Sequence, residues 1–403
     1  MPPLQLDAVQ TLAFAGVVLF IGYGVCRVVP VLGRYNLPPP IIGGLLVALI
    51  VLLAHGRGAT LLKFDTALQS PLMIAFFTSI GLGASLSLLR AGGPQVAVLL
   101  VVATIFAIAQ NVLGIVVARL FDLPPLFGVL AGSVTLTGGP ATGLAFAPLF
   151  EQAGIAGASS IALAMAMAGI VTGGLVGGPV GTFLIERYRL RGHSSSQPAQ
   201  LEPAATPDEL RNVPTPDIER AVLKNVVVIL VAMWLGAWIS RGCAALGLTL
   251  PATIGAMLAG GAVRNLDDAT GWIGLSQSIV ENVGAAALAL FLVVALMTLE
   301  LWNLAGLALP MIAILVLQVV LVAVLCCWPI FQILGKDYPS AVTVGGFIGF
   351  MLGTTANAMA VMRTLAERYG PAPRAFLVAP IVGAFFIDFT NALIITACLN
   401  IWG

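Results

Sequence analysis

The feature that most constrains this chain is a series of long apolar segments that contain hardly any charged residues. Of the 403 residues, 59% are hydrophobic and 9% are charged, whereas about 25% of an ordinary soluble domain is charged. A soluble protein of this size could not remove so much apolar surface from water. The composition therefore excludes a soluble enzyme and a disordered scaffold, and a formal net charge of +1 leaves no basic surface for nucleic acid. The apolar segments are continuous, which predicts an all-α polytopic membrane protein and not a β-barrel.

The apolar segments form two groups of six, separated by a polar stretch. Residues 187–220 are rich in charged residues, Ser and Pro, and are predicted to be a cytoplasmic linker. We therefore divide the chain into a first membrane repeat at 1–186, the linker, and a second membrane repeat at 221–403. The segments lie at about 8–26, 39–54, 71–89, 95–118, 125–149 and 155–184, and again at about 221–240, 249–263, 282–299, 305–331, 339–362 and 374–401.

A fixed offset of 213 residues relates the two groups. Leu37 recurs as Leu250, each followed by Pro, and Gly132 recurs as Gly345. Chance matching in a chain rich in Leu and Gly is the alternative explanation. The same order of segments in both halves favours an internal repeat.

The distribution of Arg and Lys indicates how the repeats are oriented. If segments 125–149 and 339–362 enter the membrane and return, each repeat has five spans and the second is inverted. With the N-terminus outside, 14 Arg and Lys residues lie inside and 4 lie outside, as the positive-inside rule requires. The prediction is two inverted five-span repeats, each with a re-entrant hairpin, with both termini outside the cell and the linker in the cytoplasm.

Both predicted hairpins carry Gly and short hydroxyl side chains in the middle of an apolar stretch. Residues 132–143 read GSVTLTGGPATG, and residues 345–357 read GGFIGFMLGTTAN. Such residues interrupt a helix, and the freed backbone groups cannot stay unpaired in hydrocarbon. A bound cation can satisfy carbonyls and hydroxyls, and a carboxylate can accept from the N–H groups of a helix start. Kinked helices with internally bonded hydroxyls are the alternative, but the recurrence in both halves favours a binding site.

Other polar residues lie within or beside the predicted spans. Asp388 is an acid in the middle of a span, where a carboxylate is costly and usually functional. It either binds Na⁺ or carries a coupling proton, and the alternative is a structural pair with a basic or hydroxyl neighbour. Asn391 lies one helical turn further on. Gln110 and Asn111 lie mid-span and either join helices or belong to the site. Arg363, at the inner end of the second hairpin, either keeps that loop in the cytoplasm or pairs with a dicarboxylate.

Four runs of sequence carry a family resemblance. They are GAFFIDFTNAL at 383–393, LPPPIIGG at 37–44, TLTGG at 135–139 and ERYG at 367–370. Together they resemble the bacterial glutamate:sodium symporter family, with matches over nearly the whole chain outside the linker. The resemblance implies import of L-glutamate coupled to Na⁺ by a homodimer. The chain departs from the family pattern at Pro140-Ala141, where His-Gly is common, and at Arg363, where a neutral polar residue is common.

The resemblance also implies kinship with the hydroxycarboxylate transporters, which use an elevator-type mechanism. Such a mechanism needs a fixed scaffold and a mobile transport domain. We expect segments 39–54 and 249–263, which are repeat mates with little polar character, to belong to the scaffold together with the spans just before them. The scaffold is expected to form the dimer contact. The transport domain is then expected at about 71–184 and 282–401.

The hairpins and the mid-span polar residues give two sets of predicted ligands. We expect Na⁺ as the co-transported ion, glutamate as the substrate, lipids and a second copy of the chain as partners, and no catalytic residues. A transporter of another small carboxylate and a channel with opposed re-entrant loops are the alternatives, while an intramembrane enzyme would need an acidic or His partner within the spans. The predicted substrate-binding residues are Thr135, Thr137, Gly138, Gly139, Thr142, Gly143, Gly353, Thr354, Thr355, Asn357 and Arg363, and the predicted sodium ligands are Ser133, Asn111, Thr355, Asp388 and Asn391.

Overall fold

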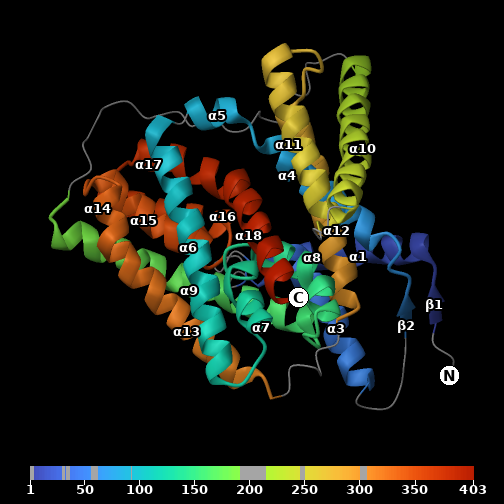
Figure 1. The fold of residues 1–403 in the computed structure, drawn as a ribbon, viewed down its shortest axis with the longest axis horizontal. Helices are drawn as coiled ribbons and strands as arrows, with labels where there is room; N and C mark the ends of the chain where they lie inside the picture. Colours follow the sequence, from blue (N-terminus) through green and yellow to red (C-terminus); the bar gives the residue numbers. More distant parts are fainter. Residues whose placement is uncertain are drawn as a thin grey trace. The chain divides into compact units, whose positions relative to one another are not determined.

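The computed structural model is almost entirely helical, which confirms the predicted class (Figure 1). The structure describes residues 4–29, 32, 37–55, 62–91, 93–190, 215–245, 250–299 and 306–403. Most of the predicted linker at 187–220 lies outside the described residues. Its last six residues, from Thr215, already belong to a helix, consistent with a Thr-Pro-Asp sequence of the kind that starts helices.

The elements are named by their order in the chain. In the first half they are β1 (Leu4–Leu6), α1 (Ala8–Val28), α3 (Pro39–His55), β2 (Leu62–Phe64), α4 (Gln69–Gly83), α5 (Leu86–Ala91), α6 (Gly93–Leu120), α7 (Pro125–Val129), the π-helix η1 (Leu130–Val134), α8 (Gly139–Gln152) and α9 (Ala158–Arg187). In the second half they are α10 (Thr215–Ala245), α11 (Ala252–Thr270), α12 (Gln277–Met297), α13 (Ala308–Leu325), the π-helix η3 (Cys326–Ile330), α14 (Phe331–Ile333), α15 (Tyr338–Met351), α16 (Thr355–Tyr369), α17 (Pro373–Ile381), the π-helix η4 (Val382–Phe386) and α18 (Ile387–Trp402). The two strands pair in parallel, Leu4 opposite Leu62.

Six described helices are long and apolar enough to cross a membrane, which confirms a polytopic membrane protein. They are α1, α6, α9, α10, α12 and the continuous run from α13 to Ile333. The remaining four predicted spans correspond to α3, α4, α11 and the run from α17 to α18, which are not among these six. The full number of spans and their orientation therefore remain predictions.

The chain forms two compact units, each drawn from both halves of the sequence. The first unit contains residues 1–72, 92–192 and 288–403, and the second contains residues 73–91 and 193–287. The first unit includes most of the predicted transport domain, but it also includes segment 39–54, which we expected in the scaffold. The division into a scaffold and a moving part therefore stays a prediction.

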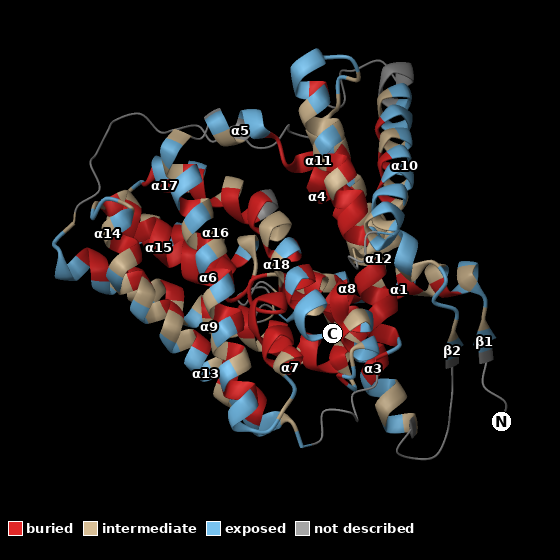
Figure 2. Ribbon diagram, viewed as in Figure 1, coloured by how far each residue is buried: buried red, intermediate tan, exposed pale blue. Residues whose placement is uncertain are grey.

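Helix α15 lies in the core of the first unit. All its residues except Pro339 are buried, and Figure 2 shows it red along most of its length. It packs against α9 and α16, and Phe347 stacks edge-on against Phe106 of α6 with 5.7 Å between ring centroids. Because its residues are buried on every side, α15 is surrounded by protein.

Two glycines bring α6 and α7 into backbone contact. A Cβ atom added to Gly114 would lie 2.1 Å from the carbonyl oxygen of Gly128, and one added to Gly128 would lie 2.2 Å from the carbonyl carbon of Gly114. No side chain fits in that space. Small residues at helix contacts permit this kind of close approach in membrane proteins.

The second unit is built around the pair α10 and α11, with the part of α4 from Met73 and the part of α12 up to Ala287. Leu82, Ile229 and Val280 form its buried apolar cluster. The other face of α10 is exposed and apolar, and includes Trp234 and Trp238. Figure 2 shows this helix mostly pale blue. Exposed apolar side chains on a membrane helix are expected to face lipid.

Candidate functional site

Both glycine-rich segments contain the helix break that the sequence predicts. The first π-helix, η1, ends at Val134, and α8 begins only at Gly139, which has a φ of +65° that favours glycine. Helix α15 ends at Met351, and Thr354 caps the start of α16 by accepting a hydrogen bond from the Asn357 N–H at 3.3 Å. We call these the first break (135–138) and the second break (352–354).

The two breaks lie against each other inside the first unit. A Cβ atom added to Gly139 would lie 3.2 Å from the carbonyl oxygen of Gly353. Gln110 of α6 touches both sides: its Oε1 accepts from Thr137 Oγ1 at 2.5 Å, and its Nε2 donates to the Met351 carbonyl at 3.0 Å. Segments more than 200 residues apart in the sequence thus meet at one buried point.

Next to this point, two asparagines hold Ser133. Asn111 Oδ1 accepts from the Ser133 N–H at 3.0 Å, and Asn391 Nδ2 donates to the Ser133 carbonyl at 2.9 Å. None of the three residues is more than 2% exposed. The structure therefore brings together three of the five predicted sodium ligands, from α6, η1 and α18.

Gln318 of α13 completes a group that we call the Ser133 cluster, consisting of Gln110, Asn111, Ser133, Gln318 and Asn391. Gln318 is fully buried, and its Nε2 donates to the backbone carbonyl of Gln110 at 2.7 Å. The sequence analysis missed this residue. The available signal was that Gln318 is the sole amide side chain in the predicted span 305–331.

The Ser133 cluster has unused hydrogen-bonding capacity. Among the described residues, six buried side-chain atoms have no hydrogen-bond partner, and four of them belong to this cluster. Each unsatisfied buried group costs about 1–3 kcal/mol, so four around one serine call for an explanation. Three are oxygens, the ligands that hard cations take. The four atoms are Asn111 Nδ2, Ser133 Oγ, Gln318 Oε1 and Asn391 Oδ1.

The other two predicted sodium ligands lie outside these contacts. Thr355 Oγ1 donates to the Gly383 carbonyl at 2.5 Å, in the π-helix that leads into α18. Asp388 is half-buried in the first turn of α18, one turn before Asn391. It makes no hydrogen bond or ion pair within the part of the chain that the structure describes.

The predicted substrate ligands divide into those at the breaks and those beside them. Thr137, Gly138 and Gly139 lie at the first break, and Gly353 and Thr354 lie at the second. Thr355 begins α16 directly after the second break, and Thr142 and Gly143 are buried in the first turns of α8.

The other three predicted substrate ligands have side chains that bond elsewhere or are exposed, although Thr135 itself belongs to the first break. Thr135 Oγ1 donates to the Leu130 carbonyl at 2.8 Å, within its own segment. Asn357 Nδ2 donates to the Ile170 carbonyl at 2.9 Å and so ties α16 to α9. Arg363 is exposed further along α16 and forms no ion pair with any described residue.

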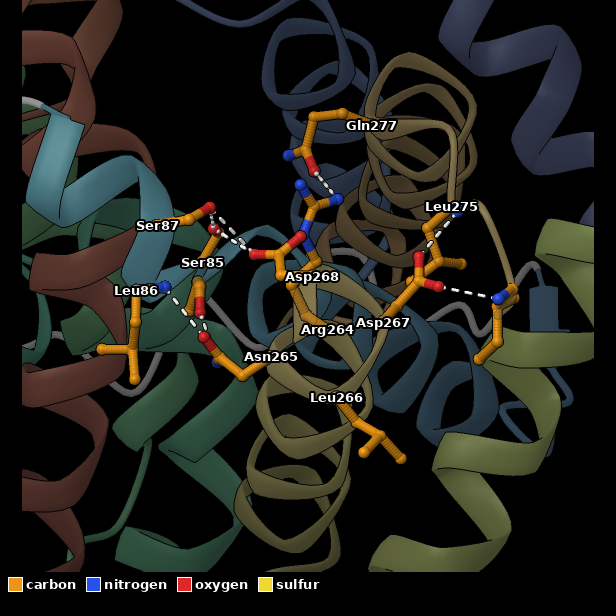
Figure 3. A network of polar contacts seen from close by, with 12 residues as sticks. Ser85, Leu86, Ser87, Arg264, Asn265, Leu266, Asp267, Asp268, Leu275 and Gln277 are labelled. Atoms are coloured by element: carbon orange, nitrogen blue, oxygen red, sulfur yellow. Dashed lines mark hydrogen bonds and ion pairs between the residues drawn. The ribbon is translucent and has the colours of Figure 1, made fainter. Parts of the chain in front are cut away.

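A second polar cluster, which we call the Asp268 network, lies in the second unit (Figure 3). Asp268 Oδ1 lies 3.0 Å from Arg264 Nε, and its Oδ2 accepts from Ser85 Oγ at 2.5 Å and Ser87 Oγ at 3.1 Å. Asn265 Oδ1 accepts from the Leu86 N–H at 2.9 Å. These contacts attach the loop before α5 and the start of that helix to α11.

Asp267, the next residue to Asp268, holds the turn that follows α11. Its carboxylate accepts from the N–H groups of Ile273, Gly274 and Leu275 at 2.7–2.9 Å. Burial alone would raise the pKa of Asp267, but these donors and the charge of Arg264 outweigh burial and lower the pKa below its usual value. The carboxylate is therefore a structural anchor.

Comparisons with known proteins agree with the resemblance seen in the sequence. Residues 4–371 match the model of a family described as sodium/glutamate symporter. The chain is 40% identical over 401 residues to the sodium/glutamate symporter of Escherichia coli (strain K12), an alignment that covers 97% of each protein. It is 37% identical over 389 residues to the sodium/glutamate symporter of Haemophilus influenzae, which covers 96% of this chain and 95% of the relative.

Proposed function

Because the chain belongs to the sodium/glutamate symporter family, we propose that it is a secondary transporter, not an enzyme, that imports L-glutamate together with Na⁺. The observation that carries the proposal is the set of unpaired oxygens in the Ser133 cluster. They lie directly beside two helix breaks, the place where transporters bind ions and substrates. A purely structural cluster would satisfy its own polar atoms.

We assign the Na⁺ to the space beside Ser133 Oγ and Asn391 Oδ1. Asn111 already gives its Oδ1 to the Ser133 N–H, so its role is to fix the orientation of Ser133. Asp388 supplies negative charge one turn from Asn391, which favours a cation in a poorly screened site. Thr355, whose hydroxyl contacts the segment leading to Asp388, remains a further proposed ligand.

We assign the substrate to the two breaks. Helix α8 starts without a side-chain cap, which leaves N–H groups and the positive end of the helix dipole for a carboxylate. The hydroxyl groups of Thr137, Thr142 and Thr354 and the glycine backbone nearby complete the proposed site, with Thr135, Thr355 and Asn357 at its edge. Arg363 would bind the second carboxylate by paired hydrogen bonds once the side chain turns toward the breaks.

We further propose the arrangement in the membrane that the sequence predicts. It consists of two inverted five-span repeats, re-entrant hairpins, both termini in the periplasm and a homodimer in the bacterial inner membrane, working by an elevator-type mechanism. A break in the corresponding glycine-rich segment of each half supports the repeat, and the 14 to 4 distribution of Arg and Lys supports the orientation. The meeting of the breaks within a single compact unit supports their movement as one body.

The test is uptake of radiolabelled glutamate into proteoliposomes that contain the purified protein. An inward Na⁺ gradient is expected to drive accumulation, and collapse of a proton gradient is expected to leave it unchanged. Uptake driven by protons without a Na⁺ effect would contradict the proposal. Competition by unlabelled small carboxylates tests the alternative substrates, and uptake that only equilibrates, with no accumulation, would indicate a channel.

A further inference from the structure

One side chain of the Ser133 cluster touches both helix breaks. Gln110 is fully buried in the middle of α6. Its amide oxygen accepts from Thr137 in the first break, and its amide nitrogen donates to the carbonyl of Met351, the residue that precedes the second break. Both halves of the amide are therefore in use, one on each break.

The position of Gln110 is fixed from two directions. Gln318 Nε2 donates to the backbone carbonyl of Gln110 at 2.7 Å. This bond holds the α6 backbone against α13. The next residue, Asn111, accepts from the Ser133 N–H, so the bridge between the breaks and the support of Ser133 share one turn of α6. A displacement of Ser133 would therefore act on the same turn of α6 that carries Gln110.

We propose that Gln110 is a positioning residue that couples Na⁺ binding beside Ser133 to glutamate binding at the two breaks. This inference rests on the proposed function and goes beyond it by naming the side chain through which the two ligands affect each other. A coupling of this kind is reciprocal: the factor by which Na⁺ changes glutamate affinity equals the factor by which glutamate changes Na⁺ affinity. Typical coupling factors are about 5–150-fold.

The chemistry of the amide predicts which substitutions preserve the coupling. Gln110→Met keeps the length of the side chain but removes both hydrogen bonds. An ionised carboxylate in Gln110→Glu retains the acceptor for Thr137 but lacks the donor for Met351. A substitution preserves the coupling only if it keeps both the acceptor and the donor, so both variants are expected to weaken it.

The experiment measures equilibrium binding of labelled glutamate to the purified full-length protein over a series of Na⁺ concentrations. Gln110→Met is expected to reduce the Na⁺-dependent change in glutamate Kd by about tenfold. The matched control is Gln332→Met. Gln332 lies in the same unit and its Nε2 donates to the Cys327 carbonyl at 3.2 Å, but it touches neither break. The control is expected to retain the coupling of the unsubstituted protein.

Melting temperatures and the amount of active protein are measured in parallel. A merely structural Gln110 would lower both but leave the ratio of glutamate Kd values at low and high Na⁺ unchanged, and that result would overturn the inference. If the unsubstituted protein binds glutamate with no Na⁺ effect, the proposed function and the inference both fail. If it shows the effect and Gln110→Met shows the same effect, the inference alone fails.

Discussion

The Ser133 cluster and the Asp268 network are both groups of polar side chains inside a mostly apolar protein, but they differ in how their atoms are satisfied. In the Asp268 network the carboxylates of Asp267 and Asp268 accept from backbone N–H groups and serine hydroxyls. Arg264 Nε lies 3.0 Å from Asp268 without hydrogen-bond geometry, so its pairing is by charge. In the Ser133 cluster, four of five residues keep an unpaired atom.

This difference distinguishes polar groups that stabilise the fold from polar groups that are available to bind a ligand. Buried polar groups that satisfy each other stabilise one conformation. Buried groups with unused oxygens cost stability until something binds to them. The Asp268 network carries more charge, yet the uncharged Ser133 cluster is the better candidate for a ligand site, because unfilled hydrogen-bonding capacity identifies it.

The largest effect on transport is expected from substitution of Asp388, an acid that has no hydrogen-bond or ion-pair partner among the described residues. Asp388→Asn is expected to abolish Na⁺-coupled uptake while the protein stays folded, because no described residue loses an ion pair and the cation loses a charge in a poorly screened site. Uptake into proteoliposomes and a melting curve measure the two properties. Asp268→Asn is the matched control, expected to lower the melting temperature and leave Na⁺ dependence intact. Normal coupled uptake by Asp388→Asn would remove this residue from the site.

A pair of buried asparagines sharpens the comparison. Asn391 Oδ1 is unpaired, whereas Asn225 in the second unit uses both ends of its amide, donating to the Ala221 carbonyl at 2.8 Å and accepting from the Ser276 N–H at 3.1 Å. Asn391→Leu is expected to raise the Na⁺ concentration for half-maximal uptake by about 100-fold, an effect at the upper end of those seen around metal sites. Asn225→Leu is expected to reduce stability alone. Equal effects of the two substitutions on Na⁺ dependence would show that an unpaired side-chain oxygen does not distinguish an ion ligand from a structural asparagine.

The Asp267 carboxylate predicts a pH dependence of stability. Its pKa is lowered in the folded protein, so its contribution is complete above the unfolded value of about 3.9 and is lost as the pH falls through the folded pKa. Asp267→Asn is expected to be less stable at neutral pH and to show a smaller loss of stability on acidification below about pH 4. Melting temperatures of both proteins between neutral and acidic pH test this. If the melting temperatures of the two proteins fall by the same amount on acidification, the Asp267 carboxylate does not anchor the turn.

The smallest expected effect is at a redundant contact. Ser87 Oγ donates to Asp268 Oδ2, the same oxygen that accepts from Ser85 Oγ. Ser87→Ala is expected to cost about 0.5–1 kcal/mol and to leave Na⁺ and glutamate dependence unchanged. A denaturation curve and an uptake assay measure these. A change in ion dependence from this substitution would mean that the Asp268 network takes part in transport.

Sequence reasoning could predict the class of the protein and part of the site. Apolar segments predict membrane helices, and the glycine-rich runs predict the two breaks, because both are local properties. Asn111, Ser133 and Asn391 could be predicted as sodium ligands because they are polar residues within apolar membrane segments. That Asn391 contacts Ser133, 258 positions away, could not be predicted from spacing.

The same limit applies to residues whose polar atoms are already in use. Thr135 and Asn357 look like ligands in the sequence, but their side chains bond to backbone carbonyls of Leu130 and Ile170. Gln318 was missed because one amide in an apolar helix is more often a packing contact than a site. Whether a buried polar atom is satisfied depends on tertiary neighbours, and a single sequence does not contain them.

The contact between Gly114 and Gly128 has a consequence for how tolerance to substitution is distributed in this chain. Asn111 lies three residues before one of these glycines and Ser133 five residues after the other, so the ion site that we propose depends on a backbone contact that admits no side chain. In a scan of all single substitutions under selection for growth on glutamate, both glycines are expected to be as intolerant as the ligands, although neither offers a side chain to an ion. Such a scan would locate the proposed ion site partly through residues that do not contact the ion.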